Sequence, residues 1–206
     1  NINIKKTLLT QYFQDIITKD VIKRHQIRND ENVTHLAKYL IENSGTRFSI
    51  NALAKSLKID NETVDNYIRA MKDAYLLIHV NHFSYSFRKR FDKNIQPKYY
   101  ISDNGFFQII ENNKKDKGQK FENIVAIQLA KQNEELTYWI DKTEVDFIVN
   151  NKAINVTTDR TNIKEREFQG LIDFKTKHKQ FKLELITPEK SYEQKEGIQI
   201  KAFDEV

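Results

Sequence analysis

The sequence contains no cysteine, two prolines and five glycines among its 206 residues. Without cysteine there is no disulfide framework, no zinc site built on thiolates and no cysteine nucleophile. The low content of glycine and proline excludes collagen-like and low-complexity classes. No apolar run approaches the roughly 18 residues of a membrane-spanning helix. Because residues 1–6 lack an apolar stretch of signal-peptide length, we expect a cytoplasmic protein with no membrane partner.

Core material is abundant, and the charge is unevenly distributed. Hydrophobic residues make up 39% of the chain and include 13 Phe and 9 Tyr, which suits one large domain or two small ones. The net charge is +6 over residues 1–106 and −1 over residues 107–206. This division suggests two modules, the first of which suits a polyanionic partner, although a solvated basic surface is the alternative. Since the chain does not begin with Met, we interpret it as a domain cut from a longer protein.

Apolar spacing in the first half predicts helices, then strands. The helices are 7–28, 33–43, 50–57 (capped by Ser49) and a segment that begins at Asp60 or Asn61 and extends to Ala74. The strands are 76–82 and 98–102, separated by a basic and aromatic stretch at 83–96. Three helices, a strand, a loop and a strand follow the winged helix-turn-helix order, with the loop as the wing.

The second half follows a different pattern. Residues 111–120 form a polar linker and are the best candidate for a domain boundary. Helices are predicted at 121–132 and 163–177, and strands at 136–140, 145–149, 153–156, 180–187 and 197–203. One helix, three strands, a second helix and further strands predict an α/β unit.

Short motifs in the second half occur in an order that resembles a known superfamily. They are GQKFEN at 118–123, YWI at 138–140, EVDFIV at 144–149 and AINVT at 153–157. In this order they resemble the PD-(D/E)xK nuclease superfamily. Together with PKYYISDNG at 97–105 and the winged helix, nearly the whole chain resembles the C-terminal region of a family of prokaryotic AAA-type ATPases whose C-terminal domain is poorly characterised.

This resemblance implies a division of the chain into three parts. Residues 1–30 are the helical tail of an ATPase module, residues 31–110 a winged helix-turn-helix, and residues 118–206 a restriction-endonuclease-like α/β domain. The implied fold class is α+β or α/β. The ATPase module itself is a partner in the full-length protein, because this chain has no Gly-x-x-x-x-Gly-Lys-Ser/Thr motif and is not expected to bind ATP.

The resemblance also assigns a catalytic site, which this sequence has only in part. The helix acid falls on Glu122 and the first-strand acid on Asp146, whereas the Glu and Lys positions of the next strand fall on Asn155 and Thr157. Asn brings no charge to Mg²⁺ and Thr brings no ammonium to phosphate or water, so the nuclease motif is vestigial. No cofactor is expected, and Mg²⁺ only if Glu122 and Asp146 still bind it. We hypothesise that Asn155 and Thr157 donate hydrogen bonds to these two carboxylates in place of a metal.

A second candidate site is the wing, where five cations are interleaved with aromatic residues: Arg88, Lys89, Arg90, Lys93 and Lys98. Such a segment suits the phosphate backbone of DNA. The helix that would read bases, residues 60–75, has a net charge of −2, so DNA binding is expected to be weak and independent of sequence. The alternatives are a basic exposed hairpin and a surface that docks on the ATPase module.

The predicted function is that of a non-catalytic DNA- or protein-binding module of an AAA-type ATPase. Two alternatives stay open: a metal-dependent nuclease with a rearranged active site, and a purely structural assembly module. A lysine that migrated to the cleft from elsewhere would favour the nuclease. For the fragment itself, enzymatic activity is not expected.

Overall fold

The chain of the computed structural model divides into two units, called here unit 1 and unit 2. Unit 1 comprises residues 1–79 and 98–115, and unit 2 comprises residues 80–97 and 116–206. The structure describes residues 2–86, 95–110, 116–132, 135–190, 195 and 197–206. The change between the units after residue 115 falls within the polar segment 111–120.

This division differs from the sequence-based modules in two ways. Residues 1–30 belong to the same unit as the helices that follow them, and the segment 80–97 belongs to unit 2. The reason for the second difference is strand pairing: residues 80–82 run parallel to residues 136–138, and the Phe83 backbone N donates to the Tyr138 backbone O at 2.7 Å. Pairing of this kind joins segments distant in sequence, so local periodicity does not reveal it.

The helices of unit 1 confirm the predicted segments. They are α1 (Ile2–Asp15), which continues as the π-helix η1 (Ile16–Lys23), then α2 (Asp30–Glu42), α3 (Ile50–Leu57) and α4 (Asn61–Asp73). Ser49 caps α3, as predicted, by accepting a hydrogen bond from the Ala52 backbone N at 3.3 Å. Asp60, rather than Asn61, caps α4 by accepting one from the Thr63 backbone N at 2.7 Å. The turn between α3 and α4 is short and has Lys58 in the left-handed conformation at φ 56°.

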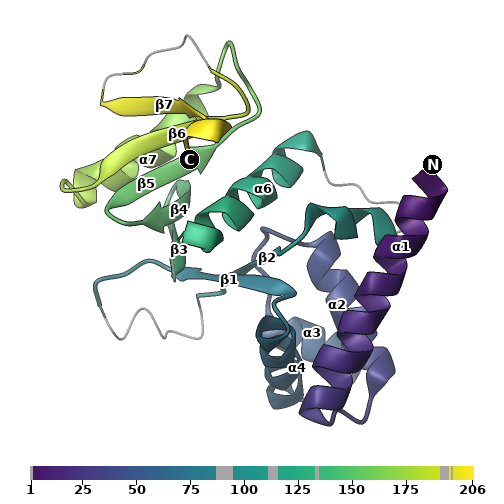
Figure 1. Cartoon of the computed structure of the whole chain (residues 1–206). Helices are drawn as coiled ribbons and strands as arrows, with labels where there is room; N and C mark the ends of the chain where they lie inside the picture. The colour runs from purple at the N-terminus through teal and green to yellow at the C-terminus, as the bar shows by residue number, and fades with distance from the viewer. Residues whose placement is uncertain (1, 87–94, 111–115, 133–134, 191–194, 196) are drawn as a thin grey trace. The chain divides into compact units, whose positions relative to one another are not determined.

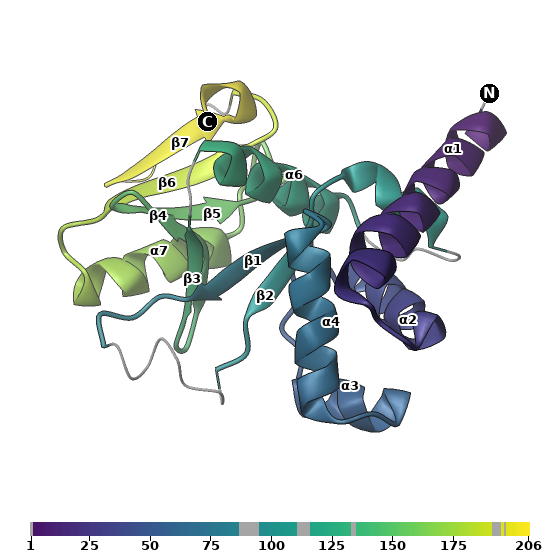
Figure 2. The ribbon, with the colours of Figure 1, turned by 60° about the horizontal axis from the view of Figure 1, so that its bottom comes forward.

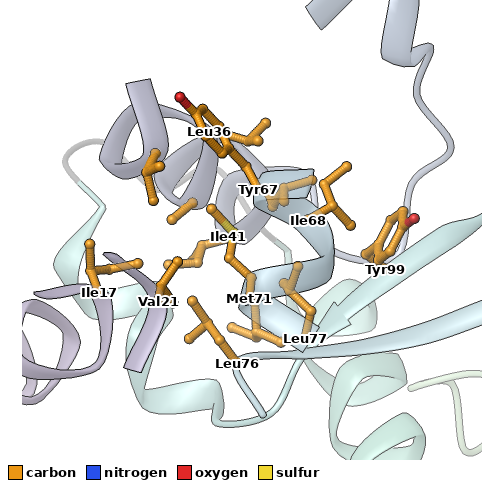
Figure 3. Close-up of a cluster of buried hydrophobic side chains, with 14 of the residues drawn as sticks. Ile17, Val21, Leu36, Ile41, Tyr67, Ile68, Met71, Leu76, Leu77 and Tyr99 are labelled. Atoms are coloured by element: carbon orange, nitrogen blue, oxygen red, sulfur yellow. The ribbon is translucent and has the colours of Figure 1, made fainter. Parts of the chain in front are cut away.

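The apolar faces of these helices meet in one core (Figure 3). Val21 of η1, Ile41 of α2 and Met71 of α4 are each fully buried there. The core is completed by the 3₁₀-helix η2 (Asn104–Ile109), whose Phe106 packs edge-on against Phe13 at 6.1 Å between ring centroids. Apolar residues spaced three and four apart lie on one face of a helix, and this is the spacing from which the sequence predicts these helices.

The strands form a seven-stranded mixed sheet in the order β2-β1-β3-β4-β5-β6-β7. Their bounds are β1 Leu77–His82, β2 Lys98–Ile101, β3 Leu136–Ile140, β4 Glu144–Val149, β5 Lys152–Val156, β6 Lys182–Thr187 and β7 Ile198–Ala202. β4 is antiparallel to both β3 and β5, whereas β5, β6 and β7 are mutually parallel neighbours. The protein is therefore of mixed α+β class.

Two helices lie on opposite faces of the unit 2 sheet, as Figure 2 shows. They are α6 (Lys117–Gln132), which precedes β3, and α7 (Glu165–Lys177), which crosses over from β5 to β6 (Figure 1). A short 3₁₀-helix, η3 (Phe203–Glu205), follows β7. Trp139 is 6% exposed and packs against Phe174 of α7, so it is a core residue. Across the described residues, no helix has both the length and the apolar character needed to cross a membrane.

Candidate functional site

A cleft of about 550 Å³ lies in unit 2 where the first turns of α6 and α7 meet the end of β5. Glu122, Asp146 and Thr157, three of the four residues predicted from the nuclease motif, line this cleft. The fourth, Asn155, lies immediately beside it on β5 and is 4% exposed. The structure therefore brings together residues that are up to 35 positions apart in the sequence.

At the cleft, side chains replace the backbone pairing of β4 and β5. The last paired residues of the ladder at this end are Phe147 and Ile154. Beyond them, the Asp146 backbone N donates to Asn155 Oδ1 at 3.1 Å, and the Val156 backbone N donates to Asp146 Oδ2 at 2.9 Å. The two side chains thus satisfy the backbone groups that become unpaired where the strands separate.

Asn155 also connects the sheet to α7. Its Nδ2 donates to the Glu167 backbone O at 2.8 Å. The hypothesis that this amide donates to a carboxylate of the cleft is therefore wrong, because the amide donates to a backbone carbonyl in the first turn of α7 instead. Thr157 also differs from the hypothesis, since its Oγ1 accepts a hydrogen bond from the Asp159 backbone N at 3.2 Å.

The charges of the cleft are mixed. Five carboxylates line it, at Asp116, Glu122, Asp146, Asp159 and Glu167, together with three cations at Lys117, Lys164 and Arg166. Arg166 Nε donates to Glu167 Oε1 at 2.8 Å, and this hydrogen bond raises the pKa of the Arg166 guanidinium. Sequence reasoning did not include Arg166 and Glu167. The right-handed crossover from β5 to β6 is the one signal that places the start of α7 beside the end of β5.

The four residues at the nuclease-motif positions do not supply a complete set of donor atoms for a resident metal ion. Within the described part of the chain, no group of three or more His, Asp or Glu residues is arranged to hold one. The Asn155 oxygen accepts from a backbone N–H, and so does one oxygen of Asp146. Mg²⁺ prefers carboxylate and water oxygens in near-ideal octahedral geometry, and two carboxylates supply only part of such a set.

The structure places the predicted wing residues only in part. Arg88, Lys89, Arg90 and Lys93 lie outside the described residues. Lys98, on β2, is 3% exposed, and burial removes it from the surface that a contact with DNA phosphates requires. The aromatic Phe83 packs edge-on against Phe174 and Phe181 in the core of unit 2, with ring centroids 5.8 and 5.4 Å apart.

The fold and the cleft define the class of this chain as a two-unit α+β protein with a polar cleft between helix termini. The chain belongs to the family described as Domain of unknown function (DUF8612), whose model matches residues 2–117. It is 35% identical over 184 residues to Uncharacterized protein MJ1544 of Methanocaldococcus jannaschii, an alignment that covers 82% of this chain and 40% of that protein.

A bacterial relative is more distant. An uncharacterized protein of Haemophilus influenzae is 25% identical over 152 residues, which cover 70% of this chain and 38% of that protein. The chain thus spans about two fifths of the length of both relatives. No solved structure matches the chain significantly.

Proposed function

We propose that the chain is a non-catalytic DNA-binding module of an AAA-type ATPase, formed by a winged helix-turn-helix and a degenerate nuclease-like domain. Support for the first part comes from the order α2, α3, α4, β1, β2 and the short turn between α3 and α4. Support for the second comes from the order α6, β3, β4, β5, α7, β6, with a parallel crossover between β5 and β6. The greater length of the relatives agrees with a module of a larger protein.

The absence of catalysis rests on one observation, the role of Asn155. This residue stands where the resemblance expects a catalytic Glu, and it is buried with both ends of its amide engaged by backbone groups. A charged Glu at this position would face the Glu167 carbonyl oxygen without a proton to donate. This role of Asn155 at the end of the strand supports a non-catalytic module.

DNA binding is tested by a titration with duplex DNA of random sequence at several salt concentrations. About four phosphate contacts would give a slope of log affinity against log salt near −3 to −4. Replacing Arg88, Lys89 and Arg90 together by Ala is expected to flatten this slope. Nanomolar binding to one sequence that survives the triple replacement would contradict the proposal, because affinity would then come from base contacts elsewhere.

A metal-dependent nuclease is the second candidate, and the cleft itself favours it. Glu122, Asp146 and Glu167 line the same cavity as Lys164, so acids and a lysine are present together. Incubation with plasmid DNA and Mg²⁺ or Mn²⁺ separates the two candidates. Intact plasmid supports the binding module, whereas cleavage that disappears in Asp146→Ala supports the nuclease.

A further inference from the structure

Unit 1 contains a second cleft, of about 460 Å³, that neither the nuclease-like resemblance nor the wing accounts for. It lies between residues 25–29, which follow η1, and one side of α4. Its polar lining includes Arg28, Arg69, His25, Asn29, Asn66 and Thr63, and no carboxylate is among the residues that line it. This composition contrasts with the cleft of unit 2, where carboxylates outnumber cations.

The local backbone explains how this cleft forms. After η1, the chain turns at Gln26, which has a φ of 53°, and the Ile27 backbone N donates to the Ile22 backbone O at 3.0 Å. A non-glycine residue in the left-handed region and a π-helix are both uncommon, and both occur preferentially at functional sites. On the other wall, Thr63, Asn66 and Arg69 are spaced three apart and therefore lie on one face of α4.

The charges of the cleft are available to a ligand. Arg28 and Arg69 are exposed, and neither forms an ion pair with any residue that the structure describes. His25 Nε2 lies 3.8 Å from Asp73 Oδ2, at the outer end of the site. Two guanidinium groups with nearby amide donors match the oxygens of a phosphate group, which arginine binds through paired hydrogen bonds.

We propose that this cleft binds the phosphate monoester group of a small molecule. The volume suits a ligand of nucleotide or sugar-phosphate size. A nucleic acid duplex is disfavoured because Glu62, Asp65 and Asp73, which do not line the cleft, are exposed on the same helix and would repel its phosphate backbone. A single phosphate is small enough to lie within the cleft, whose lining contains Arg28 and Arg69 and no carboxylate. The proposal does not depend on DNA binding by the wing.

The test is a calorimetric titration of the chain with inorganic phosphate, adenosine 5′-monophosphate and glucose 6-phosphate, with sulfate and a short DNA duplex as comparison ligands. Arg28→Gln and Arg69→Gln keep an unbranched polar side chain while removing its charge. Arg24→Gln is the matched control, because Arg24 is equally exposed and close in sequence but does not line the cleft.

We expect a phosphate monoester to bind at micromolar to millimolar concentration and each cleft variant to weaken binding by about tenfold or more, with Arg24→Gln unchanged. Thermal melts serve as the folding control. We expect the variants to fold, because both arginines are on the surface. Four results would overturn the proposal: no binding of any monoester, equal weakening by Arg24→Gln, binding of the duplex alone, or equal binding of sulfate and the monoesters. Binding of the duplex alone would make the cleft part of a DNA-binding surface, and equal binding of sulfate would make it a general anion site.

Discussion

Replacing Gly170 by Ala tests how closely α7 packs against the sheet. Gly170 lies in the interior of α7, where Ala is intrinsically favoured over Gly by about 1 kcal/mol. In the folded protein, however, a Cβ at this position would lie 2.2 Å from the Glu144 backbone O and 3.2 Å from Asn155 Nδ2. Carbon and carbonyl oxygen atoms normally approach to about 3.3 Å, so the helix must move away by about 1 Å.

This movement determines the size of the expected effect. Overpacking costs about 1–3 kcal/mol, and the upper end applies here because the obstructing atom belongs to the backbone of β4 and cannot rotate away. Subtracting the helix-propensity gain leaves a loss of about 2 kcal/mol in the free energy of unfolding. For a chain of this size, that corresponds to a decrease of about 4–8 °C in Tm.

The assay uses the fluorescence of the single tryptophan, Trp139, which packs against Phe174 of the same helix and so reports the unfolding of unit 2. Gly118→Ala is the control, since its Cβ would meet only the Asp116 side chain, at 3.2 Å, in the first turn of α6. If Gly170→Ala is as stable as Gly118→Ala in urea denaturation, the close approach of α7 to β4 is wrong.

Three further changes are expected to alter stability. Burial, followed by the neighbouring Lys72 ammonium, lowers the pKa of His79 to about 4 from its usual 6.5, so the unfolded chain takes up the proton first as pH falls. Stability should therefore decrease between pH 6.5 and 4, by at most about 3 kcal/mol, and circular dichroism melts of His79→Gln should show a smaller decrease. Asn155→Ala leaves the Asp146 N–H and the Glu167 carbonyl unpaired and should cost about 2 kcal/mol in urea denaturation, whereas the exposed Thr161→Ala should cost almost nothing. Glu184 is 4% exposed and pairs with Lys201 Nζ at 2.8 Å and with Lys152 Nζ at 3.5 Å, so Glu184→Leu should cost about 2 kcal/mol, less than a fully buried pair because both lysines can turn to water. A Glu184→Leu protein as stable as the unaltered chain would show that this pair adds nothing.

Local pattern was a reliable guide to the elements of this protein. The predicted helix at 50–57 and the predicted strand at 136–140 have the bounds that the structure shows. Caps were predictable for the same reason, since Ser49 and Asp60 act on backbone groups only three residues away. The π-helical geometry of η1 was not predictable, because a wider helix of only eight residues leaves the apolar spacing almost unchanged.

The sequence by itself thus determined the order of helices and strands and the residue types at the nuclease-like positions, because these depend on spacing along the chain. Tertiary structure decided what those residues do. Asn155 binds a backbone carbonyl of α7, and residues 80–82 join unit 2 through β3, because both contacts link segments that no local pattern relates. Arg28 and Arg69 line one cleft for the same reason. They are 41 positions apart in the sequence, and only the packing of the loop after η1 beside α4 places both in the lining.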